Sequence, residues 1–191
     1  VLAYRALPIE EAEFGSKSQE LSAAWVGVRD NELVVGKPLA LESGLPDMWN
    51  RAVTLVSQNQ VAYAYQSGSE RLTKMIVLKV DPQQQHMQVV GGPHVIAHGD
   101  SELVAAIPLA VGMLEPHTFV YYQHPGKRSM ASICRILASG DIGTCSEATW
   151  ADAELSAASG ARLHDGRLFF AYSDKDGSPF YQIFGAEQYL H

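Results

Sequence analysis

The chain carries a short run of small and aromatic residues, Ala62-Tyr63-Ala64-Tyr65-Gln66, which ends in a tyrosine followed by a polar residue. Such residues suit a pleated surface, and the run is too short for a helix, so it predicts a β-strand. Three further runs of the same character are Val1-Leu2-Ala3-Tyr4-Arg5, Phe119-Val120-Tyr121-Tyr122-Gln123 and Phe169-Phe170-Ala171-Tyr172-Ser173. Their last tyrosines recur at intervals of about 50 to 60 residues, which suits a four-stranded structural unit.

The neighbours of these runs repeat as well. Turn-like segments precede the last three runs at 57–60, 114–117 and 164–167, and others follow them at 67–70, 124–127 and 174–177. A third strand is expected at 23–29, 74–80, 130–136 and 180–183, and a fourth opens on an apolar residue and a glycine, at Val35-Gly36, Val90-Gly91 and Ile142-Gly143. The sequence therefore predicts one domain, 1–191, built from four units of approximately 1–46, 47–103, 104–154 and 155–191.

This order of turns, strands and glycines resembles a degenerate β-propeller repeat, a family of tandem four-stranded blades that mostly have no known function. The matching segments are Ser139-Gly140-Asp141-Ile142-Gly143 and Ile183-Phe184-Gly185-Ala186-Glu187-Gln188-Tyr189. The resemblance implies an all-β, propeller-like array of about four four-stranded blades, and it implies no activity. Because Val1–Arg5 matches the second strand of a blade, the array is also consistent with an incomplete propeller.

Two other folds fit the same pattern. One is a two-sheet β-sandwich in which the similarity of the turns is coincidental. The other is an α+β fold in which the segments 45–58 and 147–157 are helices.

The two cysteines, Cys134 and Cys145, face each other if Ser139-Gly140 forms a two-residue hairpin turn. They would then be a hydrogen-bonded pair with Cα atoms about 5.5 Å apart, which is within disulfide range. A disulfide would favour a secreted protein or an organelle lumen over the cytoplasm. Two buried thiols fit the same residues, so the compartment stays open.

Composition excludes several classes of function. The formal net charge of −7 and a pI near 5.4 argue against a nucleic-acid partner, which requires a basic face. No apolar run approaches the ~20 residues of a membrane helix, so we expect no membrane span.

Motifs for catalysis, cofactors or metals are missing from the sequence, since it has neither a nucleophile elbow nor a phosphate loop. His94 and His98 would point to one face of a strand, but about 13 Å apart, which excludes a shared metal. The segment 174–178 is interpreted as an Asp-Gly hairpin turn and not as a calcium loop. We therefore expect no enzyme, no cofactor and no metal.

These exclusions favour a non-enzymatic module that binds or scaffolds protein partners, as a peripheral soluble subunit of a larger complex. A lectin-like propeller is one alternative, because the aromatic residues could stack on carbohydrate. Against that use, Tyr4, Tyr65, Tyr122 and Tyr172 occupy equivalent strand positions, which fits repeated core packing better. The other alternative is a fragment of a glycoside hydrolase whose catalytic residues lie outside this stretch.

Overall fold

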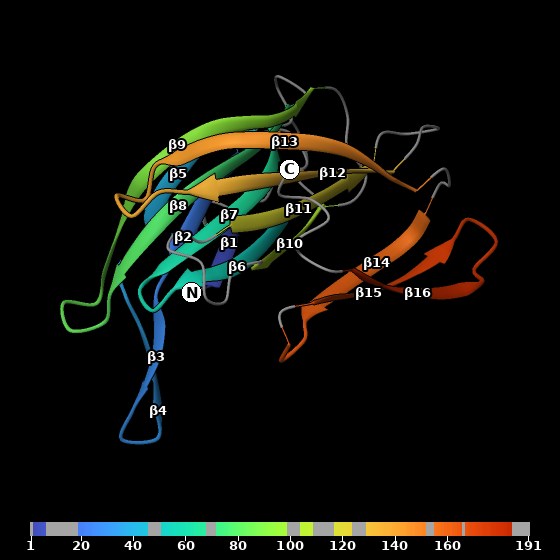
Figure 1. Cartoon of the computed structure of the whole chain (residues 1–191). Helices are drawn as coiled ribbons and strands as arrows, with labels where there is room; N and C mark the ends of the chain where they lie inside the picture. Colours follow the sequence, from blue (N-terminus) through green and yellow to red (C-terminus); the bar gives the residue numbers. More distant parts are fainter. Residues whose placement is uncertain are drawn as a thin grey trace, which may run out of the picture.

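The computed structural model describes residues 2–6, 19–45, 51–67, 72–98, 104–108, 117–123, 129–151, 155–165 and 167–184. Within these residues the chain forms β-strands and no helix, and all strand pairs are antiparallel (Figure 1). The prediction of an all-β chain is confirmed. The α+β alternative is wrong, because strands run through the described parts of both segments that were candidate helices.

The first unit is a three-stranded sheet with a hairpin that extends from it. The sheet order is β1 (Leu2–Ala6), β2 (Gln19–Ala24) and β5 (Leu39–Leu45), and the hairpin consists of β3 (Val26–Arg29) and β4 (Glu32–Val35). Asp30 and Asn31 both have positive φ, 52° and 63°, and this conformation allows a two-residue turn that follows the twist of the strands. The hairpin projects away from the other strands (Figure 1).

The second and third units are four-stranded sheets in which consecutive strands are neighbours. The second sheet contains β6 (Arg51–Ser57), β7 (Gln60–Ser67), β8 (Leu72–Asp81) and β9 (His86–His98). The third contains β10 (Val104–Pro108), β11 (His117–Gln123), β12 (Ser129–Ile136) and β13 (Ile142–Ala151).

The fourth unit is a three-stranded sheet of β14 (Leu155–Arg162), β15 (Leu168–Asp174) and β16 (Pro179–Phe184). Each tyrosine-ended run forms a strand, namely β1, β7, β11 and β15. In the second, third and fourth sheets that strand is the second one. By this equivalence, β1, β2 and β5 correspond to the second, third and fourth strands of a unit.

The second sheet is the middle layer of the core, and alternation along β7 explains why. Val61, Tyr63 and Tyr65 point to one face, where Leu39 and Trp25 of the first unit pack against them. The residues between them point to the opposite face, because successive side chains of a strand alternate.

On that opposite face, Ala62 and Ala64 belong to a buried cluster that includes Cys134 and Ile136 of the third sheet. The small alanine side chains let the third sheet approach closely, while the tyrosines fill the space toward the first unit. A two-sheet sandwich does not describe this core, since the second sheet is covered on both faces.

First strands of consecutive sheets lie next to one another. β10 contacts β6 and β7 of the preceding sheet, and it also contacts β14 of the following sheet. At the opposite edge of these sheets, the fourth strands β9 and β13 are in less extensive contact. The sheets are therefore packed most closely along their first strands.

At two places a glycine of one unit meets the turn between the third and fourth strands of the next unit. A Cβ atom on Gly91 of β9 would overlap the carbonyl oxygen of Gly140, in the turn between β12 and β13. A Cβ atom on Gly36, which follows β4, would lie 2.7 Å from the carbonyl oxygen of Gln85, in the turn between β8 and β9. Real Cβ atoms essentially never come this close to another heavy atom. Two of the three apolar-glycine steps of the sequence, at Gly36 and Gly91, are thus contacts between sheets, whereas Gly143 meets only its own sheet. The prediction that each step opens a fourth strand holds for β13 alone, because Gly36 lies between β4 and β5 and Gly91 lies inside β9.

Candidate interaction surface

Of the four repeated tyrosines, the structure describes the side chains of Tyr65 and Tyr172. Tyr65 is buried, and its hydroxyl donates a hydrogen bond of 2.5 Å to Glu42 Oε2. Tyr172 is half-buried and stacks on Phe180, with ring centroids 5.5 Å apart. Tyr4 and Tyr122 lie on β1 and β11, and their side chains are outside the described part of the chain.

Glu42 links the first unit to the second sheet. It lies on β5, and besides Tyr65 it accepts a hydrogen bond of 3.1 Å from Ser67 Oγ. Lys74 Nζ lies 3.3 Å from Glu42 Oε1, and both side chains are largely buried. This charged group therefore joins a fourth strand to the second and third strands of the next sheet, and it is held by charge-assisted hydrogen bonds.

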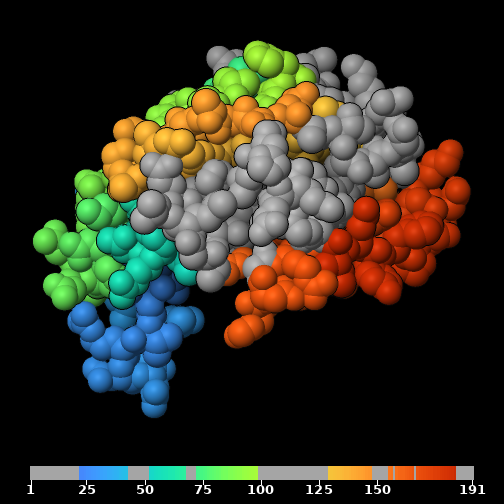
Figure 2. Space-filling view, in the orientation of Figure 1, coloured from blue at the N-terminus to red at the C-terminus, as the bar shows by residue number. Residues whose placement is uncertain are grey.

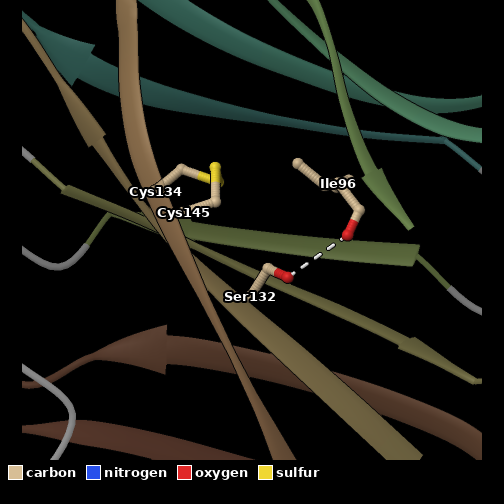
Figure 3. Close-up of a disulfide and its surroundings, with 4 residues drawn as sticks. All are labelled: Ile96, Ser132, Cys134 and Cys145. Carbon is tan, nitrogen blue, oxygen red and sulfur yellow. Dashed lines mark hydrogen bonds between the residues drawn. A yellow bond between two sulfur atoms is a disulfide. The ribbon is translucent and has the colours of Figure 1, made fainter.

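Cys134 and Cys145 are paired across β12 and β13 and joined by a disulfide with an S–S distance of 2.00 Å (Figure 3). Their Cα atoms are 4.0 Å apart, not about 5.5 Å, so they resemble the closely spaced kind of antiparallel pair. Beside them, Ser132 Oγ donates a hydrogen bond of 3.4 Å to the carbonyl oxygen of Ile96 in the second sheet (Figure 3).

The turn that sets this pairing differs from the predicted one. It contains three residues, Ala138-Ser139-Gly140, because Leu137 and Asp141 are joined by a backbone hydrogen bond and Gly140 has a φ of +96°. A three-residue turn shifts the register by one residue. A β-bulge on β13, just after Ile142, restores the register at the cysteines.

Histidines and acidic residues do not form a metal site in the described part of the chain. His94 pairs with Met75, and His98 pairs with Leu72. Because Met75 and Leu72 are three residues apart, the two histidines point to opposite faces. The prediction of a common face was wrong, since β9 carries a bulge between them.

Asp174 begins a hairpin turn, as expected. Its Oδ1 accepts hydrogen bonds of 2.9 Å from the backbone N–H groups of Asp176 and Ser178. Gly177 donates its N–H to the carbonyl oxygen of Asp174 and has a φ of +80°. The carboxylate is therefore engaged with the backbone of its own turn.

The exposed ion pair of Asp165 and Arg167 shifts the pKa of both side chains. Arg167 Nε donates a hydrogen bond of 2.7 Å to Asp165 Oδ2, and this bond holds the pKa of Asp165 below its ordinary value of 3.8. The backbone N–H of Arg167 also donates to Asp165 Oδ1, at 3.1 Å. The same pairing raises the pKa of Arg167. The pair lies in a turn and both side chains are about half exposed, so it indicates local structure and no reactive centre.

The fourth sheet presents apolar side chains to solvent on one face. We call this the open face and define it by Phe169 and Ala171 on β15 and Tyr181 and Ile183 on β16. Tyr181 is 72% exposed and Ile183 is 43% exposed, while Phe169 and Ala171 are half-buried. The Tyr181 ring stacks on Phe169, with centroids 6.1 Å apart. Figure 2 shows the fourth sheet at the surface, at one end of the molecule.

The strand register relates the open face to a buried face of the second sheet. In the fourth sheet Ala171 pairs with Tyr181, and at the equivalent position of the second sheet Ala64 pairs with Met75. In the same way, Phe169 pairs with Ile183 as Ala62 pairs with Val77. All four residues of the second sheet are completely buried, and they lie in the cluster that contacts the third sheet. The open face therefore occupies the position that in the second sheet is an interface.

The β3–β4 hairpin is a second exposed apolar region. Val28, Leu33 and Val35 are exposed, and Val28 lies directly opposite Leu33. This hairpin projects from the body of the molecule (Figure 2). No buried equivalent of the hairpin occurs in the described part of the other units, so its apolar residues have no internal comparison.

Comparison with known proteins gives no family for this chain. No family model matches the sequence, and no curated protein matches it either. In the described residues, no helix is long and apolar enough to cross a membrane. The sequence had not singled out the open face, because Tyr181 and Ile183 alternate like the buried residues of β8.

Proposed function

We propose that this chain is a non-enzymatic module that binds a protein partner through the open face of its fourth sheet, as a peripheral subunit of a larger complex. The observation that supports the proposal is the exposure of Tyr181 and Ile183 at positions whose equivalents, Met75 and Val77, are fully buried. Burying an apolar side chain of this size stabilises an interface by about 1.5–3 kcal/mol. A contiguous apolar face of this kind is typical of protein interaction sites.

The packing of the second sheet indicates what kind of partner surface would fit the open face. The equivalent face of the second sheet is covered by an antiparallel sheet that presents Cys134 and Ile136. A β-sheet with small or medium apolar side chains on one face would fit the open face in the same manner. Tyr181 would then be the anchor, because buried aromatic residues dominate the energy of interfaces.

The same packing supports a finer proposal about the fold. The units are consecutive blades of a propeller-like array, in which β6, β10 and β14 are the inner strands and β9 and β13 are outer strands. Two features support it: the inner strands adjoin one another in turn, and a glycine contact recurs at the outer part of two successive interfaces.

A crosslinking experiment tests the binding face. The photoreactive amino acid p-benzoylphenylalanine replaces Tyr181 in one sample and Leu33 in the control, since both side chains are exposed on strands. After irradiation in extracts of the source cells, we expect a discrete protein adduct from position 181 and none of the same mass from position 33. Equal labelling from both positions, or none from position 181, contradicts the proposal.

A lectin is the second candidate, because the exposed Tyr181 ring stacks on Phe169 at an interplanar angle of 24° and could serve as a platform for a sugar ring. Binding to a glycan array that is lost in a Tyr181→Ser variant would support this alternative. Binding that survives in Tyr181→Ser, or no binding to the array, removes it.

A further inference from the structure

The pairing of β13 with β12 changes by one residue between the turn and the disulfide. Next to the turn, Ile136 pairs with Ile142. If that register continued without a bulge, Cys134 would lie opposite Thr144, and we call this the turn register. The bulge on β13 instead places Cys134 opposite Cys145, and we call this pairing the disulfide register.

The side chains of β13 do little to select between these two registers. Residues 143–149, Gly-Thr-Cys-Ser-Glu-Ala-Thr, include no large apolar side chain. A strand without an apolar pattern has a weakly specified register. The ladder also changes register a second time, between Met130 and Ser129. Among the described strands, β13 pairs with β12 alone, so a slip of β13 would break only one ladder. The disulfide is therefore the constraint that holds β13 in the disulfide register.

The turn register would suit the side of β13 that faces the second sheet. Ser132 is buried on that side, where its Oγ donates a hydrogen bond to the carbonyl oxygen of Ile96 (Figure 3). In the disulfide register the residue opposite Ser132 is Glu147. In the turn register it would be Ser146, because a slip of one residue moves every side chain to the other face. An acidic side chain would thus be replaced by a small uncharged one, and the bulge would disappear.

We infer that the bond between Cys134 and Cys145 is a redox switch of strand register. In the oxidised chain the bond holds β13 in the disulfide register. In the chain reduced by a dithiol, β13 slips by one residue into the turn register. Thr144 and Ser146 then turn toward the second sheet, and Glu147 turns away from it. This device lies apart from the open face and does not depend on the proposed function.

A dithiol reductant opens the bond by thiol–disulfide exchange. Cys145 is half-buried and Cys134 is fully buried, so the first thiolate of the reductant attacks Cys145 Sγ. A bond forms between these two sulfurs as the bond to Cys134 breaks, and the Cys134 thiolate takes a proton from water. The second thiolate of the reductant then displaces Cys145 Sγ, which is protonated in turn. The chain gains two electrons and two protons, and the reductant becomes a disulfide.

NMR spectroscopy of the unchanged chain tests the slip. Directly opposite residues of the closely spaced kind have neighbouring Hα atoms, and this kind of pair alternates along the ladder, so Ser132 and Glu147 belong to it with the two cysteines. We expect an Hα–Hα cross-peak between Ser132 and Glu147 in the oxidised chain. On reduction it should disappear and be replaced by one between Ser132 and Ser146, and reoxidation should reverse the change. Cross-peaks between β7 and β8 should stay, which shows that the reduced chain is folded.

Two exchange variants give a covalent readout of the same registers. Thr144→Cys/Cys145→Thr exchanges two neighbouring residues and places the second thiol where the turn register would bring it opposite Cys134. The matched control, Cys145→Ser/Ser146→Cys, moves that thiol by one residue in the other direction. Both variants are reduced and then placed in the same oxidising dithiol buffer, and intact mass and thiol alkylation follow closure. We expect complete closure in the first variant and largely free thiols in the control.

The two readouts together decide the inference. It is overturned if the cross-peak between Ser132 and Glu147 persists in the reduced chain, or if that cross-peak is lost and none to Ser146 appears. Closure of both exchange variants, or of neither, also overturns it. Crosslinking at Tyr181 is a separate measurement, so these results leave the proposed function untouched.

Discussion

Gly91 of the second sheet lies directly against the backbone of Gly140 in the third, with room for no side chain between them. Gly36 and Gln85 form the equivalent contact between the first unit and the second sheet. Two successive interfaces thus contain the same kind of contact. In each, a glycine that follows an apolar residue in one unit meets the turn between the third and fourth strands of the next unit. At these two interfaces the repeat in the sequence is therefore a repeat of contacts between sheets as well as of strands.

Replacing Gly91 by alanine should destabilise the chain by about 1–3 kcal/mol, because a new Cβ atom overlaps backbone atoms that cannot rotate away. Gly143→Ala is the matched control. It stands at the equivalent apolar-glycine step, where the nearest atom to a new Cβ is 3.3 Å away. Urea unfolding of both variants gives the comparison. Equal losses of stability would argue against the special role of the Gly91 contact.

Glu42→Ala should lower the free energy of unfolding by about 2 kcal/mol, because it removes the carboxylate that accepts from Tyr65 and Ser67 and faces Lys74. The control is Glu32→Ala on the exposed hairpin, where a surface substitution should change stability by no more than about 0.5 kcal/mol. Thermal and urea unfolding measure both. A Glu42→Ala variant as stable as Glu32→Ala would contradict the linking role of Glu42.

Protein prepared without reductant should have an intact mass two hydrogens lower than reduced protein, because Cys134 and Cys145 are joined. The double variant Cys134→Ala/Cys145→Ala should lose about 3 kcal/mol of stability, as expected for a disulfide that closes a short loop. Mass spectrometry and urea unfolding test the two statements. Identical masses, or a double variant that unfolds like the oxidised chain, would refute them.

Arg167→Ala should raise the pKa of Asp165 toward 3.8, because the hydrogen bond from Arg167 is the largest cause of its lowering. A carboxylate with a lowered pKa stabilises the fold above its unfolded pKa, and that contribution disappears as the pH falls through the folded pKa. The stability difference between the two proteins should therefore be present at neutral pH and vanish in acid below pH 3.8. NMR titration of the Asp165 carboxyl carbon measures the pKa, and an unchanged value in Arg167→Ala would exclude the pairing in solution.

The local sequence pattern predicts much of the fold. The small and aromatic residues of Ala62-Tyr63-Ala64-Tyr65 predict a strand, and the polar segments around it predict its turns. The burial of both faces of this strand is seen only in the structure. The turn at Ser139-Gly140 was one residue longer than predicted, because a bulge that compensates for a turn residue leaves no mark in the sequence. The opposite orientations of the two histidines on β9 went unpredicted for the same reason.

The candidate surface could not be predicted in this way. Tyr181 on β16 and Met75 on β8 occupy the same register position, and both look like core residues in the sequence. Whether such a residue is buried depends on whether another sheet packs over it, which is a property of the assembled molecule. The contact between Glu42 and Lys74 is likewise long-range, and neither residue stands in a motif.

Chemical modification of Tyr181 tests the central claim, that the open face is an interface, most directly. Tyrosine nitration followed by mass spectrometry is compared between the isolated chain and the proposed complex, purified from the source cells under gentle conditions. Tyr65 is the internal control, because it is buried in the chain itself and should stay unmodified in both samples. We predict that Tyr181 is nitrated readily in the isolated chain and is protected in the proposed complex. Equal nitration of Tyr181 in the two samples would contradict the account.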